Sequence, residues 1–223
     1  MGGKNPIVVL DDADLDRAVE AATVGAFFQT GQRCTASSRM IVTEGVYDQF
    51  VERLINRLGE LKIDSALLPD TDIGPAVDQA QYRQDLEYIE IGKSEATLAF
   101  GGNVLTRSTP GFYVEPTLFV DTNNQMRINR EEMFGPLATV IPAKDYEEAL
   151  ELANDTPYGL AASVFTRDAH RFGRLLSASA GRNGHVQYAH GRTGLSRSVR
   201  RGQSIQLWYA RARHLREGIL YNG

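Results

Sequence analysis

The sequence predicts an α/β fold in which a mostly parallel sheet is flanked by helices. Two observations lead to this prediction: short apolar runs suited to buried strands, and segments whose apolar residues recur at three- and four-residue spacing. The two kinds of segment alternate along the chain, as they do in parallel sheets covered by helices. The 223 residues suffice to bury a core, and 23% charged residues is an ordinary content for a globular protein.

The first predicted elements lead into a glycine-marked turn. Residues 7–10 form a short apolar run typical of a buried strand. Asp14 is a suitable N-cap for a helix that continues through Phe28 and delivers the chain to the turn. We then expect a strand at residues 40–43 and a helix at 46–61. The apolar residues of this second helix follow helical spacing: Phe50, Leu54, Leu58 and Leu61.

The rest of the chain continues the alternation. Proline and glycine mark residues 69–75 as a loop, which we expect to be followed by a helix at residues 79–91. The remaining expected strands lie at residues 97–100, 117–120, 138–141 and 161–166. The remaining expected helices lie at residues 146–153 and 169–179.

Cys34 is the only cysteine, and it lies where the helical pattern gives way to the turn, in the run from Phe27 to Arg39. A thiol reacts as its thiolate, and free backbone N–H groups together with the neighbouring cation Arg33 favour that form. The alternative is that Cys34 is an inert small hydrophobic residue. A single cysteine excludes an internal disulfide framework.

Four motifs in order point to one family. Residues 27–34 match F-x-x-x-G-Q-x-C, residues 2–6 are G-G-K-N-P, residues 131–136 match E-E-x-F-G-P, and residues 154–160 match N-x-x-x-Y-G-L. Together they resemble the aldehyde dehydrogenase superfamily. The wording of residues 32–39 is similar to the branch that acts on 2-oxoglutarate semialdehyde (2,5-dioxopentanoate).

The resemblance implies an oxidoreductase that converts an aldehyde to a carboxylate through a thiohemiacetal and a thioester on Cys34, with NAD or NADP. It also implies that Glu132 binds the hydroxyls of the nicotinamide ribose, that Phe134 packs against the cofactor and that Phe28 lines the substrate site. Each has a structural alternative: an ordinary acidic turn for Glu132, a core aromatic for Phe134, and packing on its helix face for Phe28. The partner is then a small-molecule aldehyde, and the parent enzyme is expected to be a homo-oligomer.

The resemblance also predicts what the sequence does not hold. In the family a general-base glutamate lies two residues before the Gly-Gly-Lys, and here Met1 takes the intervening leucine's place. We therefore expect residues 1–181 to be part of the catalytic domain, with the N-terminal nucleotide-binding domain missing, doubtful cofactor binding and no activity alone. The alternative function is a non-catalytic remnant that retains only the fold or subunit contacts.

Residues 182–223 differ in composition from everything before them. They hold eight arginines, no lysine, no aspartate and one glutamate, a formal charge of +7 against −11 for residues 1–181. Read one base later, the codons for residues 198–201 are compatible with Pro-Phe-Gly-Gly, the start of the family's next motif, P-F-G-G-x-K. We therefore expect a frameshift-derived, irregular basic tail. A nucleic-acid-binding arm and a solvated basic tail are the alternatives.

The remaining expectations concern location and partners. The chain has no basic segment followed by an apolar stretch at its start, and no apolar run approaches the roughly 20 residues that span a bilayer. We expect a reduced, cytoplasmic protein with no membrane partner, no nucleic-acid partner and no metal site.

Overall fold

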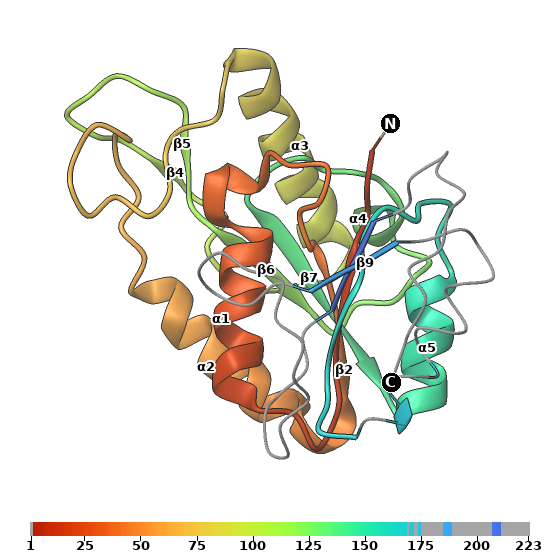
Figure 1. The fold of residues 1–223 in the computed structure, drawn as a ribbon. Coiled ribbons are helices and arrows are strands. Elements are labelled where there is room, and N and C mark those ends of the chain that lie inside the picture. Colours follow the sequence, from red (N-terminus) through yellow and green to blue (C-terminus); the bar gives the residue numbers. More distant parts are fainter. Residues whose placement is uncertain (1, 169, 172–173, 175–184, 189–206, 211–223) are drawn as a thin grey trace.

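The computed structural model describes residues 2–168, 170–171, 174, 185–188 and 207–210. Its centre is a six-stranded sheet (Figure 1). In spatial order the strands are β3 (Thr97–Phe100), β6 (Thr117–Val120), β7 (Leu137–Ala143), β2 (Arg39–Thr43), β1 (Pro6–Val9) and β8 (Ser163–Phe165). Only the β3–β6 pair is antiparallel, so the predicted mostly parallel sheet is confirmed.

Helices cover both faces of this sheet. They are α1 (Leu15–Ala26), α2 (Tyr47–Gly59), α3 (Gln79–Glu95), α4 (Arg127–Arg130) and α5 (Tyr146–Asn154), with 3₁₀ turns η1 (Phe28–Gly31) and η2 (Glu44–Val46). Successive strand residues point to opposite faces. Ile7 and Met40 therefore pack in the cluster that contains α1 and α2, whereas Val8 and Ile41 pack in the cluster that contains α5.

Aspartates begin three of the helices. The Asp14 carboxylate accepts a hydrogen bond from the backbone N–H of Arg17 (3.2 Å), which confirms the predicted N-cap of α1. Asp78 and Asp145 cap α3 and α5 in the same way. Such caps satisfy donors that the first helical turn leaves free.

The main departures from the predicted elements are short. Helix α1 ends at Ala26, because the chain turns into η1 instead of continuing to Phe28 as a helix. The two-residue strands β4 (Val104–Leu105) and β5 (Tyr113–Val114) and the single turn α4 were not predicted, since such short segments have no readable periodicity. Most of the helix expected at residues 169–179 lies outside the described residues.

The expectation of an irregular tail is wrong for eight residues. β9 (His185–Tyr188) and β10 (Leu207–Ala210) form a two-stranded antiparallel sheet of their own. Both segments combine apolar or aromatic residues that suit strands. The rest of the tail lies outside the described residues, so the boundary at residue 181 and the frameshift stay predictions.

None of the helices in the described part of the chain is long and apolar enough to cross a membrane.

Candidate functional site

The cysteine loop follows α1 through an unusual backbone. Gln29, Thr30 and Gly31 all have positive φ, between 57° and 63°. Only glycine adopts this conformation without strain. The Thr30 hydroxyl donates to the carbonyl of Gly74 (3.1 Å), and at Gly31 a Cβ would overlap the carbonyl of Gly135. The loop is therefore held on two sides, and Gly31 is needed for both its conformation and this close approach.

The side chain of Asn5 holds the cysteine loop through hydrogen bonds. Its side-chain amide donates to the carbonyls of Cys34 (3.0 Å) and Ala36 (2.8 Å), while its oxygen accepts from the N–H of Ala161 (2.9 Å). Asn5 is itself buried. One side chain thus joins the start of β1, the cysteine loop and the approach to β8. Gly3 completes this packing, because a Cβ there would overlap the Cys34 carbonyl.

Cys34 itself is exposed at the turn, and Arg33 points elsewhere. The Arg33 guanidinium donates to the carbonyls of Val24 (2.7 Å) and Gly25 (2.9 Å) near the end of α1. Burial lowers the pKa of Arg33, and the neighbouring Cys34 opposes that shift. Arg33 therefore anchors the loop to α1, a contact that the sequence did not reveal. Activation of the thiol by this cation stays a prediction.

The second loop carries Glu132 and Phe134. The Glu132 carboxylate accepts a hydrogen bond from the N–H of Gly3 (2.9 Å), and a Cβ at Gly2 would overlap this carboxylate. Phe134 has a φ of 56°, and the residue as a whole is 37% exposed. A non-glycine residue in this conformation needs support from its surroundings.

The two loops line a small hollow of about 10 Å³, roughly the room of one water molecule, that opens to solvent. Gly3 and residues from the stretches 31–38 and 132–137 line it, Glu132 and Phe134 among them. Cys34 is not among the lining residues, although Arg33 and Ala36 on either side of it are. Phe28 is not among the lining residues; it is half-buried and packs against the core of the α1 face. The structure thus brings Glu132 and Phe134 together beside the cysteine loop.

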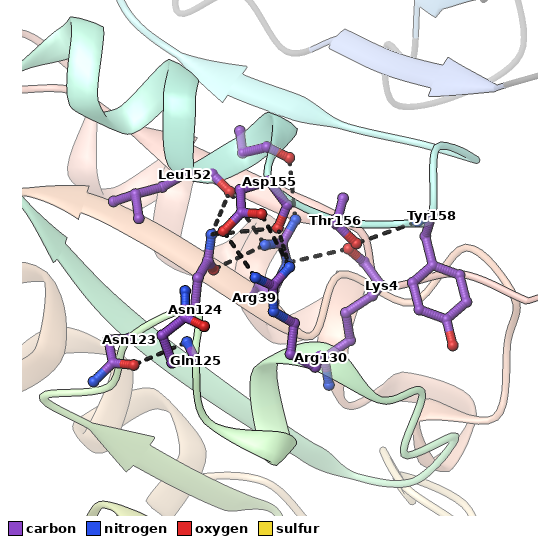
Figure 2. Close-up of polar contacts among 11 residues, drawn as sticks. Lys4, Arg39, Asn123, Asn124, Gln125, Arg130, Leu152, Asp155, Thr156 and Tyr158 are labelled. Atoms are coloured by element: carbon purple, nitrogen blue, oxygen red, sulfur yellow. Dashed lines mark hydrogen bonds and ion pairs between the residues drawn. The ribbon is translucent and has the colours of Figure 1, made fainter.

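Arg39 is a buried cation beside the G-G-K-N-P segment, and its role was not predicted from the sequence. Arg39, fully buried at the start of β2, donates through its Nη atoms to the side chain of Asn124 (3.1 Å) and to the carbonyls of Leu152 (3.2 Å) and Ala153 (3.1 Å) (Figure 2). Its Nε donates to the carbonyl of Lys4 (3.2 Å). Burial lowers the pKa of Arg39 to about 10, so the group remains charged at neutral pH. It joins the end of α5 to the G-G-K-N-P segment.

Lys4 is the other buried cation of this segment. Its Nζ is buried and has no hydrogen-bond partner among the described residues. Burial, reinforced by Arg39, lowers the pKa of Lys4 to about 7, while Glu132 and Glu131 oppose the shift. Its place inside the motif beside Gly3 was visible in the sequence, but its burial was not.

Comparison with known proteins shows which family the chain resembles. The model of the aldehyde dehydrogenase family matches residues 1–196. The chain is 46% identical over 180 residues to a betaine aldehyde dehydrogenase of Mesorhizobium japonicum, covering 79% of this chain and 37% of that protein. It is equally identical to an alpha-ketoglutaric semialdehyde dehydrogenase of Bacillus subtilis, covering 79% and 36%.

Solved structures agree with the sequences. A 1-pyrroline-5-carboxylate dehydrogenase from Thermus with bound NAD superposes with a TM-score of 0.77 at 41% identity, covering 80% of this chain and 34% of that one. A betaine aldehyde dehydrogenase from Staphylococcus aureus in complex with NAD+ gives 0.77 at 38% identity, covering 79% and 36%. The chain thus spans little more than a third of the length of the relatives it matches. From the motifs, the fold and these matches, the chain belongs to the aldehyde dehydrogenase family of oxidoreductases.

Proposed function

We propose that residues 1–181 form part of the catalytic domain of an NAD(P)-dependent aldehyde dehydrogenase in which Cys34 is the nucleophile. The observation that supports this best is the shared hollow between the cysteine loop and the loop that carries Glu132 and Phe134. Because the chain spans about 37% of the length of the betaine aldehyde relative, the complete reaction is proposed for the whole protein.

The residues around the hollow fit a nicotinamide ribose. The Glu132 carboxylate can accept two hydrogen bonds from adjacent hydroxyls, and only one of its oxygens is used by Gly3. Phe134, which is partly exposed, offers an apolar side chain beside it. When bound, the oxidised nicotinamide supplies the two-electron acceptor that aldehyde oxidation requires. We therefore assign Glu132 and Phe134 to the binding of NAD or NADP.

Cys34 supplies the covalent chemistry. Its Sγ, after loss of its proton to solvent, attacks the aldehyde carbon and forms a C–S bond while the carbonyl π pair moves to oxygen. Backbone N–H groups of the exposed turn are suited to stabilise that oxyanion. Once the carbon is oxidised to the acyl level, attack by water breaks the C–S bond, releases the carboxylate and restores the thiol. Asn5 contributes by fixing the Cys34 carbonyl, and hence the turn.

Which aldehyde the whole protein uses is a more specific proposal. We infer a 2-oxo-dicarboxylic semialdehyde, because residues 32–39 resemble the branch that uses 2-oxoglutarate semialdehyde. Overall identity does not decide this, since the semialdehyde and betaine aldehyde relatives are both 46% identical. We assign Phe28 to the aldehyde side of the site. The kcat/KM ratio of the whole protein for the two aldehydes tests the inference, and a preference for betaine aldehyde would contradict it.

The nucleophile is testable in the 223-residue polypeptide. Alkylation by iodoacetamide and acylation by p-nitrophenyl acetate need the thiol and oxyanion donors but no hydride acceptor. We expect Cys34 to be alkylated faster than a free peptide thiol and to release one p-nitrophenolate per chain, and the Cys34→Ala variant to lose that release. We expect no aldehyde-dependent NAD(P)H formation from these residues alone, given the third of the relatives that they cover.

A matched control separates a site from a merely accessible thiol. Asn5→Ala removes the amide that holds the Cys34 carbonyl, so it should slow acylation while the cysteine stays present. Alkylation no faster than that of a peptide thiol, together with equal rates in Asn5→Ala, would favour the non-catalytic remnant instead.

A further inference from the structure

The peptide between the two proposed cofactor residues is held by α3. Met133 lies between Glu132 and Phe134, and its carbonyl accepts hydrogen bonds from the side-chain amides of Gln84 (2.9 Å) and Gln81 (3.3 Å). Residues three apart on a helix lie on the same face, so both amides reach one oxygen from the first turns of α3. Both glutamines are half-buried.

Asp85 orients one of these amides. Its Oδ1 accepts from the Gln81 Nε2 (2.8 Å), which leaves that nitrogen's other hydrogen for the Met133 carbonyl. The Asp85 side chain is completely buried and lies against Gly135, where a Cβ would overlap its Oδ1. A buried carboxyl group placed here acts as a fixed acceptor between the helix and the loop.

Glu132 and Phe134, on either side of Met133, have different surroundings. Glu132 reaches the Gly3 N–H, whereas Phe134 takes a left-handed backbone conformation and is partly exposed. A carbonyl held by two donors restrains the plane of the Met133–Phe134 peptide, and with it the backbone that leads from Glu132 into Phe134. The left-handed φ of Phe134 therefore has a support in α3.

We propose that Gln81, Gln84 and Asp85 are positioning residues that set the placement of Glu132 and Phe134 for the nicotinamide ribose. This inference rests on the proposed function. None of the three needs to touch the cofactor, and Met133 transmits their effect through its backbone. Their role is to hold the loop in its binding geometry before the cofactor arrives.

Hydrogen exchange of the 223-residue chain tests the positioning directly. In a Gln81→Ala/Gln84→Ala double variant we expect the amides of residues 133–136 to exchange about ten- to a hundredfold faster, since two hydrogen bonds that restrain the loop are lost. Gln79→Ala is the matched control, because Gln79 is an exposed glutamine on the same helix. Faster exchange confined to this loop, with an unchanged unfolding midpoint, is not expected from a merely structural role.

Asp85 variants distinguish an acceptor from a space-filling group. Asp85→Asn keeps an oxygen that can accept from Gln81 and should preserve slow exchange in the loop, whereas Asp85→Ala should raise it. Unchanged exchange in both the glutamine double variant and Asp85→Ala would overturn the proposal.

Titration with NADH, followed by its fluorescence, separates this inference from the proposed function. Where the wild-type chain binds NADH, we expect the double variant to raise the Kd about tenfold and Gln79→Ala to leave it unchanged. An equal Kd in wild type and double variant, despite a loosened loop, would overturn the positioning role. If wild type and Glu132→Ala bind NADH with equal Kd while exchange rises as expected, positioning of the loop is supported and the assignment of Glu132 to the cofactor fails.

Discussion

Among single residues, the buried amine of Lys4 and the buried carboxyl group of Asp85 have the most strongly shifted ionisation. The Lys4 Nζ and the Asp85 Oδ2 are both buried without a hydrogen-bond partner among the described residues. Burial raises the pKa of Asp85 to about 7, although the bond from Gln81 opposes this, and burial lowers the pKa of Lys4 to about 7. Each site therefore favours its neutral form. The two groups respond to pH in opposite directions.

Asp85 should make the fold less stable as pH rises towards neutrality. Between pH 4 and 7 the folded state retains a proton that the unfolded state has lost, since its ordinary pKa is 3.8. The free energy of unfolding therefore falls over this range. Relative to wild type, the free energy of unfolding of Asp85→Asn should increase by about 1–4 kcal/mol as the pH rises from 4.5 to 8. Urea unfolding at both pH values measures it. Glu87→Gln, at an exposed position on α3, should show no such gain, and an equal gain there would contradict the prediction.

Lys4 should act over the alkaline range. Below pH 7 the folded state bears the cost of a buried ammonium, and the free energy of unfolding rises from pH 7 to about 10 as the amine becomes neutral. Lys4→Met should therefore be more stable than wild type by about 1–4 kcal/mol at pH 6, with the difference shrinking at pH 9.5. Chemical denaturation at the two pH values decides this, with exposed Lys144→Met as control. A difference independent of pH would speak against a buried charge.

At the scale of elements, Arg39 closes the end of α5. Helices end with carbonyls that have no intrahelical donor, and Arg39 supplies donors to those of Leu152 and Ala153. Asn124 adds its own amide to the Leu152 carbonyl (2.9 Å) (Figure 2). The helix is thereby attached to β2 in the middle of the sheet.

Arg39→Lys should be costly despite the retained charge. A lysine ammonium on a flexible stem cannot reproduce the planar set of donors to Asn124 and the α5 carbonyls. We expect a loss of about 2–4 kcal/mol in the free energy of unfolding, measured with urea. Arg53→Lys, at an exposed pair with Asp16, should cost about 0.5 kcal/mol or less. Similar costs at the two positions would show that the buried geometry of Arg39 is not what matters.

The sequence predicted the sheet and its helices well because periodicity records burial. The strands at residues 97–100 and 117–120 match β3 and β6, and Asp14 caps α1 as expected. The motifs also predicted cofactor-binding roles for Glu132 and Phe134, and both residues line one hollow, although the roles themselves stay predictions. Contacts between distant residues have no local signal. The Met133 carbonyl held by α3, and Arg33 turned towards α1, could not be read from spacing alone.

Residues 1–181 and residues 182–223 differ in net charge and in the sheet to which their strands belong. Residues 1–181 carry −11 and residues 182–223 carry +7, while all strands of the six-stranded sheet lie within residues 6–165. Within the part of the chain that the structure describes, β9 and β10 pair only with each other. The sheet thus does not depend on the basic segment for any of its strand pairs. Sequencing the gene across the codons for residues 175–190 tests the frameshift itself.

Removal of residues 182–223 should leave the sheet folded. Because the six strands and their covering helices lie earlier in the chain, we expect a shortened polypeptide of residues 1–181 to keep its circular dichroism and to unfold within a few degrees of the full chain. Thermal unfolding of the two polypeptides side by side measures the difference. Loss of the cooperative transition would show that the basic segment is part of the folded domain and would move its boundary.

The three hydrogen bonds of Asn5 have a consequence for folding during synthesis of the chain. Its contact with Ala161 spans 156 positions of sequence, and the same side chain shapes the turn at Cys34. At roughly 5–20 residues per second of synthesis, about 8–30 s separate the appearance of these two partners. During that interval the nascent chain presents its thiol on an unfinished turn. The turn that carries Cys34 is therefore completed only after Ala161 has been synthesised.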